Sequence, residues 1–151
     1  MKKIFLTIFI LIFLNSCGFQ TIYSSKNLKQ FSIKIINIEG ETDINNFIKG
    51  NLKPYENDLY EKKFNLIIKT DYEKRILTKN KQGKATDYEL AVKANFEINS
   101  DTNNYNVETI KKINIKSMED LFQERKYEKS IKQNLVNIIT DELINKISVM
   151  E

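Results

Sequence analysis

Histidine and tryptophan are absent from this chain of 151 residues, and cysteine and proline occur once each. Without an imidazole, the chain cannot build a Ser-His-Asp triad, a Cys-His pair or a His-ligated zinc site. A single cysteine cannot form an intramolecular disulfide or a metal site of several thiolates. These absences exclude much of enzyme chemistry, while a carboxylate or lysine enzyme remains open.

A strong excess of charge of one sign is also missing. The chain has 24 basic and 20 acidic residues, a net charge of +4. Because Lys2 and Lys3 lie at the extreme N-terminus, the rest of the chain carries 22 basic and 20 acidic residues, a net charge of only +2. We therefore expect no nucleic-acid partner. The length fits one domain with a real core and leaves no room for a second sizeable domain.

Long hydrophobic runs are absent except at the N-terminus. Two lysines there precede the apolar run from Ile4 to Leu14, which only Thr7 interrupts. A membrane-spanning helix needs about 20 apolar residues to cross roughly 30 Å of hydrocarbon, so this run is too short to be a permanent anchor of the usual kind. The pattern predicts a signal peptide over residues 1–16.

The only cysteine follows this apolar run directly. Leu14 stands three residues before Cys17 and the small Ser16 stands next to it, an arrangement that resembles the bacterial lipobox. The resemblance implies diacylation of the Cys17 thiol, cleavage before it and acylation of the new amino group. Each buried CH₂ contributes about 0.8 kcal/mol, so two or three chains would hold the protein on a membrane. The alternative is an incidental or buried thiol after an ordinary signal peptide.

The residue after the cysteine bears on which membrane holds the protein. Gly18 stands where an aspartate would favour retention at the inner membrane in bacteria that use that rule. By resemblance, the expected location is the outer membrane, with the protein lipid-anchored on its periplasmic side.

Six periodic segments follow along the mature chain. Apolar residues alternate with polar ones in the strand-like segments and recur every three or four residues in the helical ones. Gly83 lies in a polar segment between two strands and is the residue most able to adopt a positive φ there. The predicted elements are a strand at 31–38, a helix capped by Thr42 or Asp43 and ending near 51–53, strands at 64–72, 88–98 and 105–115, and a helix from Ser117 to Ile147.

This order predicts an α+β fold. A four-stranded sheet with one apolar face must be covered, and the two helices carry the only apolar stripes that could cover it. We therefore expect a two-layer sandwich with the order β-α-β-β-β-α, both helices on one face of the sheet and the other face wet. Residues 17–29 would be a lipidated tether and residues 30–151 a single domain.

Two short motifs carry a family resemblance. Residues 17–23 read Cys-Gly-Phe-Gln-Thr-Ile-Tyr, which is similar to the Cys-Gly-Phe-x-Pro-Leu-Tyr opening of many lipopolysaccharide-assembly lipoproteins of the LptE type, especially those of alphaproteobacteria. Thr21 stands where proline is common. Residues 88–96 resemble the Tyr-x-Leu-x-Val-x-x-x-Tyr/Phe strand of that family, and the order and length of the expected elements agree as well.

The resemblance implies a protein that is not an enzyme. LptE-type proteins bind the large outer-membrane barrel LptD, sit in its lumen as a plug, assist its assembly and take part in delivering lipopolysaccharide to the cell surface. The expected partners are therefore LptD, lipopolysaccharide and the membrane that holds the acyl chains. No cofactor or metal is expected.

Direct contact with lipopolysaccharide would require cations that meet its phosphates. We take Arg75, Lys81 and Lys84 as the candidates, with Arg75 the one donor in its group that could bind a phosphate with two hydrogen bonds. They belong to a wider set of Lys74, Arg75, Lys79, Lys81 and Lys84, with a second group at Lys111, Lys112 and Lys116. The alternative reading is a solvated loop in a lysine-rich protein.

Two further functions stay open at this stage. A periplasmic lipoprotein of this size could act as a chaperone or pilot for another envelope protein. An enzyme could use a carboxylate pair such as Asp87 and Glu89, but these lie two apart on an exposed strand face, where a buried site with shifted pKa values is not expected.

Overall fold

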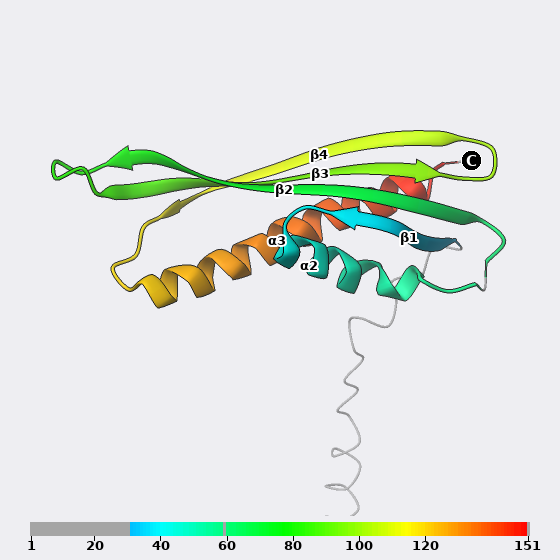
Figure 1. Ribbon diagram of the computed structural model, residues 1–151, viewed down its shortest axis with the longest axis horizontal. Coiled ribbons are helices and arrows are strands. Elements are labelled where there is room, and N and C mark those ends of the chain that lie inside the picture. The colour runs from blue at the N-terminus through cyan, green and yellow to red at the C-terminus, as the bar shows by residue number, and fades with distance from the viewer. Residues whose placement is uncertain (1–30, 59, 151) are drawn as a thin grey trace, which may run out of the picture.

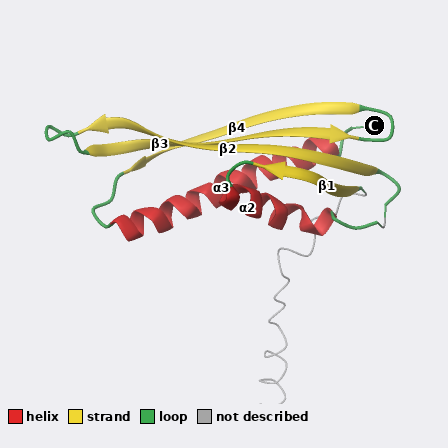
Figure 2. Ribbon diagram, in the orientation of Figure 1, coloured by secondary structure: helices red, strands yellow, loops and turns green. Residues whose placement is uncertain are grey.

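The computed structural model describes residues 31–58 and 60–150 as a two-layer α+β sandwich. Figures 1 and 2 show both helices on one face of the sheet, which confirms the predicted fold class and element order. The elements are β1 (Ser32–Glu39), α2 (Thr42–Leu52), a 3₁₀ turn (Lys53–Tyr55), β2 (Lys63–Lys79), β3 (Ala85–Asn99), β4 (Asn104–Lys116) and α3 (Leu121–Ile147).

The sheet is mixed, with the strand order β1-β2-β3-β4. β1 runs parallel to β2 because α2 carries the chain back between them, whereas β2, β3 and β4 form an antiparallel meander. The register of β1 against β2 shifts between Ile35 and Asn37, so Ile36 is an extra residue in a bulge. This bulge explains why the alternation of apolar residues in this strand is blurred.

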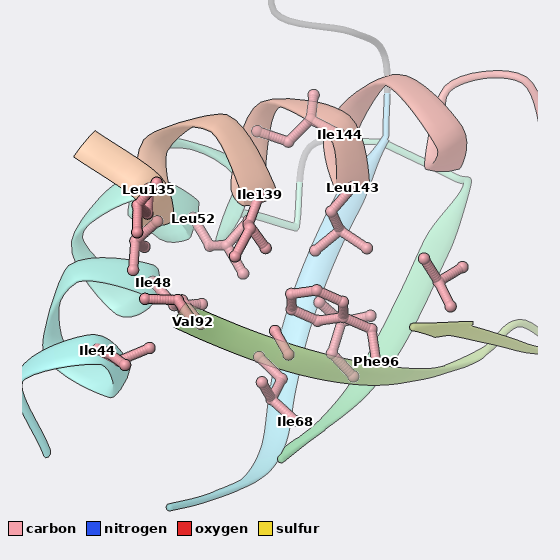
Figure 3. Packing of buried hydrophobic residues seen from close by; sticks show 14 of the residues in the cluster. Ile44, Ile48, Leu52, Ile68, Val92, Phe96, Leu135, Ile139, Leu143 and Ile144 are labelled. Atoms are coloured by element: carbon pink, nitrogen blue, oxygen red, sulfur yellow. The ribbon is translucent and has the colours of Figure 1, made fainter. Parts of the chain in front are cut away.

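The core lies between the inner face of the sheet and the two helices, as Figure 3 shows. α2 contributes Ile44, Ile48 and Leu52, all of which are fully buried. Their spacing of four residues places them on one face of the helix. The central strands and α3 complete the core with Phe64, Leu66, Ile68, Leu90, Val92, Phe96, Ile98, Leu135, Ile139, Leu143 and Ile147.

The α2 helix ends at Leu52, within the predicted range, but its N-cap is not one of the predicted residues. Glu41 caps the helix, because its Oε2 accepts a hydrogen bond of 2.8 Å from the Ile44 amide. The prediction of Thr42 or Asp43 was wrong, since both lie inside the first turn. The longer glutamate side chain is also held by Lys132 of α3, a tertiary contact that sequence preferences do not contain.

The α3 helix begins later than predicted. Ser117 does not cap it; its amide donates a hydrogen bond of 2.8 Å to the Thr86 carbonyl of β3, so this residue continues the sheet pairing and lies three residues before the N-cap. Asp120 is the N-cap, and its Oδ1 accepts from the amides of Phe122 and Gln123. The long amphipathic helix itself is confirmed.

The hairpin of β2 and β3 is longer than the alternation of apolar residues predicted. β2 continues to Lys79, where the pattern predicted an end at residue 72, and β3 begins at Ala85 instead of residue 88. Apolar alternation stops where the helices stop covering the sheet, but antiparallel pairing continues through Arg75 and Ile76, opposite Glu89 and Tyr88. The backbone pairing of β2 with β3 therefore extends beyond the apolar core.

A close approach fixes the turn between β1 and α2. Gly40 has φ +110°, and a Cβ atom there would lie 1.9 Å from the backbone oxygen of Thr70. No other residue type fits at this point without moving β2. The turn therefore depends on a glycine that packs against the second strand.

Candidate functional site

The sheet reaches beyond the helices at one end of the molecule. Figure 1 shows the tip of the β2–β3 hairpin projecting past the first turn of α3. We call this region the open end; it consists of residues 74–89 of the hairpin, 113–116 of β4 and 121–125 of α3. It contains the three cationic residues that the sequence singled out.

The turn of the hairpin is held by one asparagine. The Asn80 Oδ1 accepts hydrogen bonds of 3.0 Å from the amides of Gln82 and Lys84. Gly83 adopts φ +79°, as predicted, and its amide donates to the Asn80 carbonyl at 3.0 Å. The turn therefore presents the side chains of Lys81 and Lys84 to solvent from a hydrogen-bonded backbone.

The structure separates the candidate cations into two groups. Arg75 lies on the outer face of the sheet, where its Nη2 is 2.9 Å from the Glu89 Oε1. Lys112 of β4 reaches the same oxygen at 3.5 Å. Lys81 and Lys84, in contrast, form no ion pair with any residue that the structure describes. The turn lysines, more than Arg75, are available to meet an external anion.

Two other lysines of the predicted clusters are occupied by the α3 helix. The Lys74 Nζ lies 2.8 Å from the Glu124 Oε1 and 2.9 Å from the Glu128 Oε2. Lys111 of β4 forms an ion pair with Glu142. Both lysines are on the inner face of the sheet, so their charges are neutralised within the protein.

Lys74 belongs to a partly buried group of polar and charged side chains between the sheet and the helices, which we call the polar seam. Its members are Glu41 of the α2 cap, Tyr72 and Lys74 of β2, and Glu124, Glu128 and Lys132 of α3. The Tyr72 hydroxyl donates to the Glu128 Oε1 at 2.7 Å. Lys132 binds the Glu41 Oε1 at 3.0 Å and lies 4.0 Å above the Tyr72 ring. The seam thus joins α2, α3 and β2.

The seam shifts the pKa values of its members. Burial alone would raise the pKa of Glu128, but hydrogen bonds from Lys74 and Tyr72 outweigh burial and hold that pKa below its usual value. Hydrogen bonds from Lys74 and from the Met118 amide lower the pKa of Glu124. Burial and the neighbouring Glu128 carboxylate raise the pKa of Tyr72.

Our sequence reasoning missed the seam, although the sequence contained a signal for it. Lys74 has the same strand parity as the buried Leu66 and Ile68, so it faces inward. Glu124, Glu128 and Lys132 recur every four residues along one stripe of α3. A charge at an inward strand position together with a charged helical stripe indicates a partly buried ion network.

The open end also exposes apolar side chains. Phe122 and Leu121, in the first turn of α3, are 71% and 67% exposed. The other large apolar side chains exposed in this region are Ile76, Leu77 and Ile113. Exposed apolar groups and lysines that no described residue pairs with therefore occur together at this end, a composition that suits a ligand with both anionic and apolar parts.

The carboxylates considered for catalysis are engaged in structural contacts. Asp87 accepts hydrogen bonds from the hydroxyls of Thr78 and Thr86, which lower its pKa. Glu89 is shared by Arg75 and Lys112. Among residues 31–58 and 60–150, no group of three carboxylate, thiol or imidazole side chains lies close enough to hold a metal ion.

The N-terminal predictions cannot be placed in this fold. Cys17, the signal peptide and the tether lie outside the described residues, so lipidation stays a prediction. Over the described part of the chain, neither helix is sufficiently long and apolar to cross a membrane.

Solved structures share this fold. The rare lipoprotein B of Shewanella oneidensis superposes with a TM-score of 0.56 at 13% identity, over 78% of this chain and 95% of that one. A candidate lipoprotein from Caulobacter crescentus CB15 superposes with a TM-score of 0.50 at 10% identity, over 77% of this chain and 87% of that one. No protein-family model and no curated protein sequence matches the chain. The chain therefore has the fold of these two bacterial proteins.

Proposed function

We propose that this protein is an outer-membrane lipoprotein, anchored through Cys17 on the periplasmic side, that binds and plugs the lipopolysaccharide-assembly barrel LptD. It supports the assembly of that barrel and the delivery of lipopolysaccharide to the outer leaflet, and it acts by binding, without catalysis. The N-terminal pattern, the resemblance to LptE-type proteins and the fold shared with a rare lipoprotein B and a candidate lipoprotein support this proposal.

The observation that carries the proposal is the composition of the open end. Lipopolysaccharide joins phosphate groups to several acyl chains. Lys81 and Lys84 offer ammonium groups that form no ion pair with a described residue, and a lysine binds a phosphate as a point charge. Leu121 and Phe122 offer exposed apolar area in the same region. The open end thus has the two kinds of group that such a ligand requires.

The outer face of the sheet fits a polar enclosure. Charged side chains on this face pair with one another across the strands, as Arg75 does with Glu89 and Lys93 with Glu108 at 2.9 Å. Cross-strand pairs of opposite charge leave a hydrated surface that carries little net field. Such a surface is compatible with the lumen of a barrel that polar side chains line.

Co-purification from native membranes tests the proposal. The full chain with a C-terminal tag would be crosslinked in its own cells, extracted in mild detergent and recovered, and its partners identified by mass spectrometry. The proposal predicts a large outer-membrane barrel protein in the eluate and its loss when Cys17→Ala removes the anchor. Recovery of another envelope protein in its place would favour a chaperone or pilot, and recovery of no barrel protein would refute the proposal.

A further inference from the structure

The sheet has a free edge at β1. Among the described residues this strand pairs only with residues 63–69 of β2, so no described strand covers the backbone N–H and C=O groups on its other side. Ile33 is buried, but Ile35, Ile36 and Ile38 are not. An edge strand with several partly exposed isoleucines is a template for pairing with another strand.

A groove lies beside this edge. Its volume is about 570 Å³, and it is lined by residues 35–38 of β1, by Lys49 and Gly50 of α2, by Lys53 of the 3₁₀ turn and by Glu56. Gly50 widens it, because a Cβ atom at that position would meet nothing within 4 Å. A second hollow of about 340 Å³ shares Ile35 and Glu56, but residues 63–65 of β2 also line it, so it lies over the paired start of β1 and β2. The groove therefore offers an extended chain room beside residues 35–38 of β1.

The bulge in β1 turns an apolar side chain toward this space. Ile36 is the extra residue of the bulge, lines the groove and is 53% exposed. Bulges often redirect one side chain next to a functional site. Ile36 would give the floor of the groove an apolar contact for a side chain of the added strand.

We propose that this groove binds an extended, acidic segment of a partner protein, which adds to the sheet as a fifth strand beside β1. Backbone hydrogen bonds to the free edge would supply affinity, and the side chains of alternate residues would meet the groove. Lys49 and Lys53 form no ion pair within the described part of the chain, and they outnumber Glu56 among the lining residues. Carboxylates on the added strand would form ion pairs with these lysines.

The same charges disfavour the chain itself as the occupant. Residues 17–29, which precede β1, include Lys26 and Lys29 and no acidic residue. A second copy that paired through its own β1 would bring one lysine and one glutamate, together with a second pair of groove lysines. Neither occupant would bring the carboxylates that are needed to balance the groove lysines.

The groove is distant from the open end. β1 stops pairing at Lys69 of β2, whereas the hairpin turn begins at Asn80, and Figure 1 shows β1 in the half of the sheet away from the hairpin tip. The inference therefore does not rest on lipopolysaccharide contact, and each site can be tested without altering the other.

The test uses the mature full chain in detergent micelles and a library of eight-residue peptides that alternate Val or Thr with Glu, or with Lys in a matched set. We expect the glutamate peptides to bind at least tenfold more tightly than the lysine peptides, measured by fluorescence anisotropy. Amide hydrogen exchange should slow in residues 32–39 on binding. Equal affinity for both sets, binding to neither set, or protection confined to other strands would overturn the proposal.

Variants locate the binding. Gly50→Leu fills the groove while improving the helix propensity of α2, so the fold should be retained. This substitution should lower the affinity for the glutamate peptides at least tenfold. Ile110→Asp changes an exposed isoleucine on the opposite edge strand and should leave binding unchanged. Unchanged binding in Gly50→Leu would place the peptide elsewhere, and dimerisation that Gly50→Leu abolishes would identify a second copy as the occupant; either result overturns the proposal.

Discussion

The two ends of the sandwich are built on different principles. Under α2 and the C-terminal half of α3, the inner face of the sheet is apolar and closed, with Phe96 and Ile68 fully buried. Toward the open end the same face carries Tyr72 and Lys74, which meet glutamates of α3. The covered half stabilises the fold, whereas the open end can carry exposed lysines and apolar side chains with little effect on stability.

The largest predicted effect is a difference in the free energy of unfolding between a truncation in the covered half and one in the open end. Phe96→Ala removes a fully buried ring and should lower the free energy of unfolding by about 3–5 kcal/mol. Ile76→Ala, at a half-exposed position of the open end, should lower it by less than about 1 kcal/mol. Urea denaturation of both variants measures the difference. Similar losses would show that the open end belongs to the same core.

Two glycines with positive φ provide a matched comparison. Gly40→Ala in the covered half places a Cβ against the Thr70 backbone and should cost about 3 kcal/mol or more. Gly83→Ala at the hairpin tip meets no neighbour and should cost only about 1 kcal/mol for its φ. Thermal unfolding would reveal the order of the two melting temperatures. A reversed order would contradict the close packing of the turn between β1 and α2.

The polar seam predicts an acid dependence of stability. The pKa values of Glu124 and Glu128 are lower in the folded state than in the unfolded chain. Their contribution is therefore full above about pH 4.3, the ordinary glutamate value, and is lost as the pH falls through the lower folded values. Stability should decrease from pH 5 to pH 3.

Glu128→Gln isolates that contribution. The change should lower the free energy of unfolding by about 1–3 kcal/mol at pH 7, because Lys74 and Tyr72 lose a charged acceptor. It should also make the free energy of unfolding depend less on pH in the acid range. Glu97→Gln, on the outer face of β3, is the control. Denaturant titrations at several pH values test this, and an equally steep acid dependence in Glu128→Gln would exclude the seam as its source.

The smallest predicted effect on stability is at the hairpin tip. Lys81→Glu with Lys84→Glu should change the free energy of unfolding by no more than about 0.5 kcal/mol per substitution, because neither side chain forms an ion pair with a described residue. Circular dichroism during thermal unfolding provides the check. A large loss would mean that the tip supports the fold and is not free for a ligand.

Periodicity alone could predict the covered half and little of the open end. The spacing of Ile44, Ile48 and Leu52 and the alternation in β3 identified the elements that bury them. The helix caps at Glu41 and Asp120 could not be found this way, because Lys132 holds the Glu41 side chain and the hydrogen bond from Ser117 to Thr86 extends the sheet pairing before α3 begins. Tertiary contacts override local preference at these points.

The candidate site was only partly predictable for the same reason. The turn chemistry of residues 80–84 correctly located the exposed lysines Lys81 and Lys84. Strand parity shows that Lys74 and Arg75 face opposite sides of the sheet, but only the pairing register brings Arg75 beside Glu89. Which cations are left without a partner is a property of the folded sheet and not of the lysine pattern.

Lipopolysaccharide binding by two matched double variants tests the central claim most directly. Lys81→Glu with Lys84→Glu and Lys49→Glu with Lys53→Glu change the net charge equally, at the open end and at the β1 groove. Our account predicts at least a tenfold weaker affinity for purified lipopolysaccharide in the first variant and an unchanged affinity in the second. Unchanged affinity in the first variant, or equal losses in both, would contradict the assignment of the open end as the ligand site.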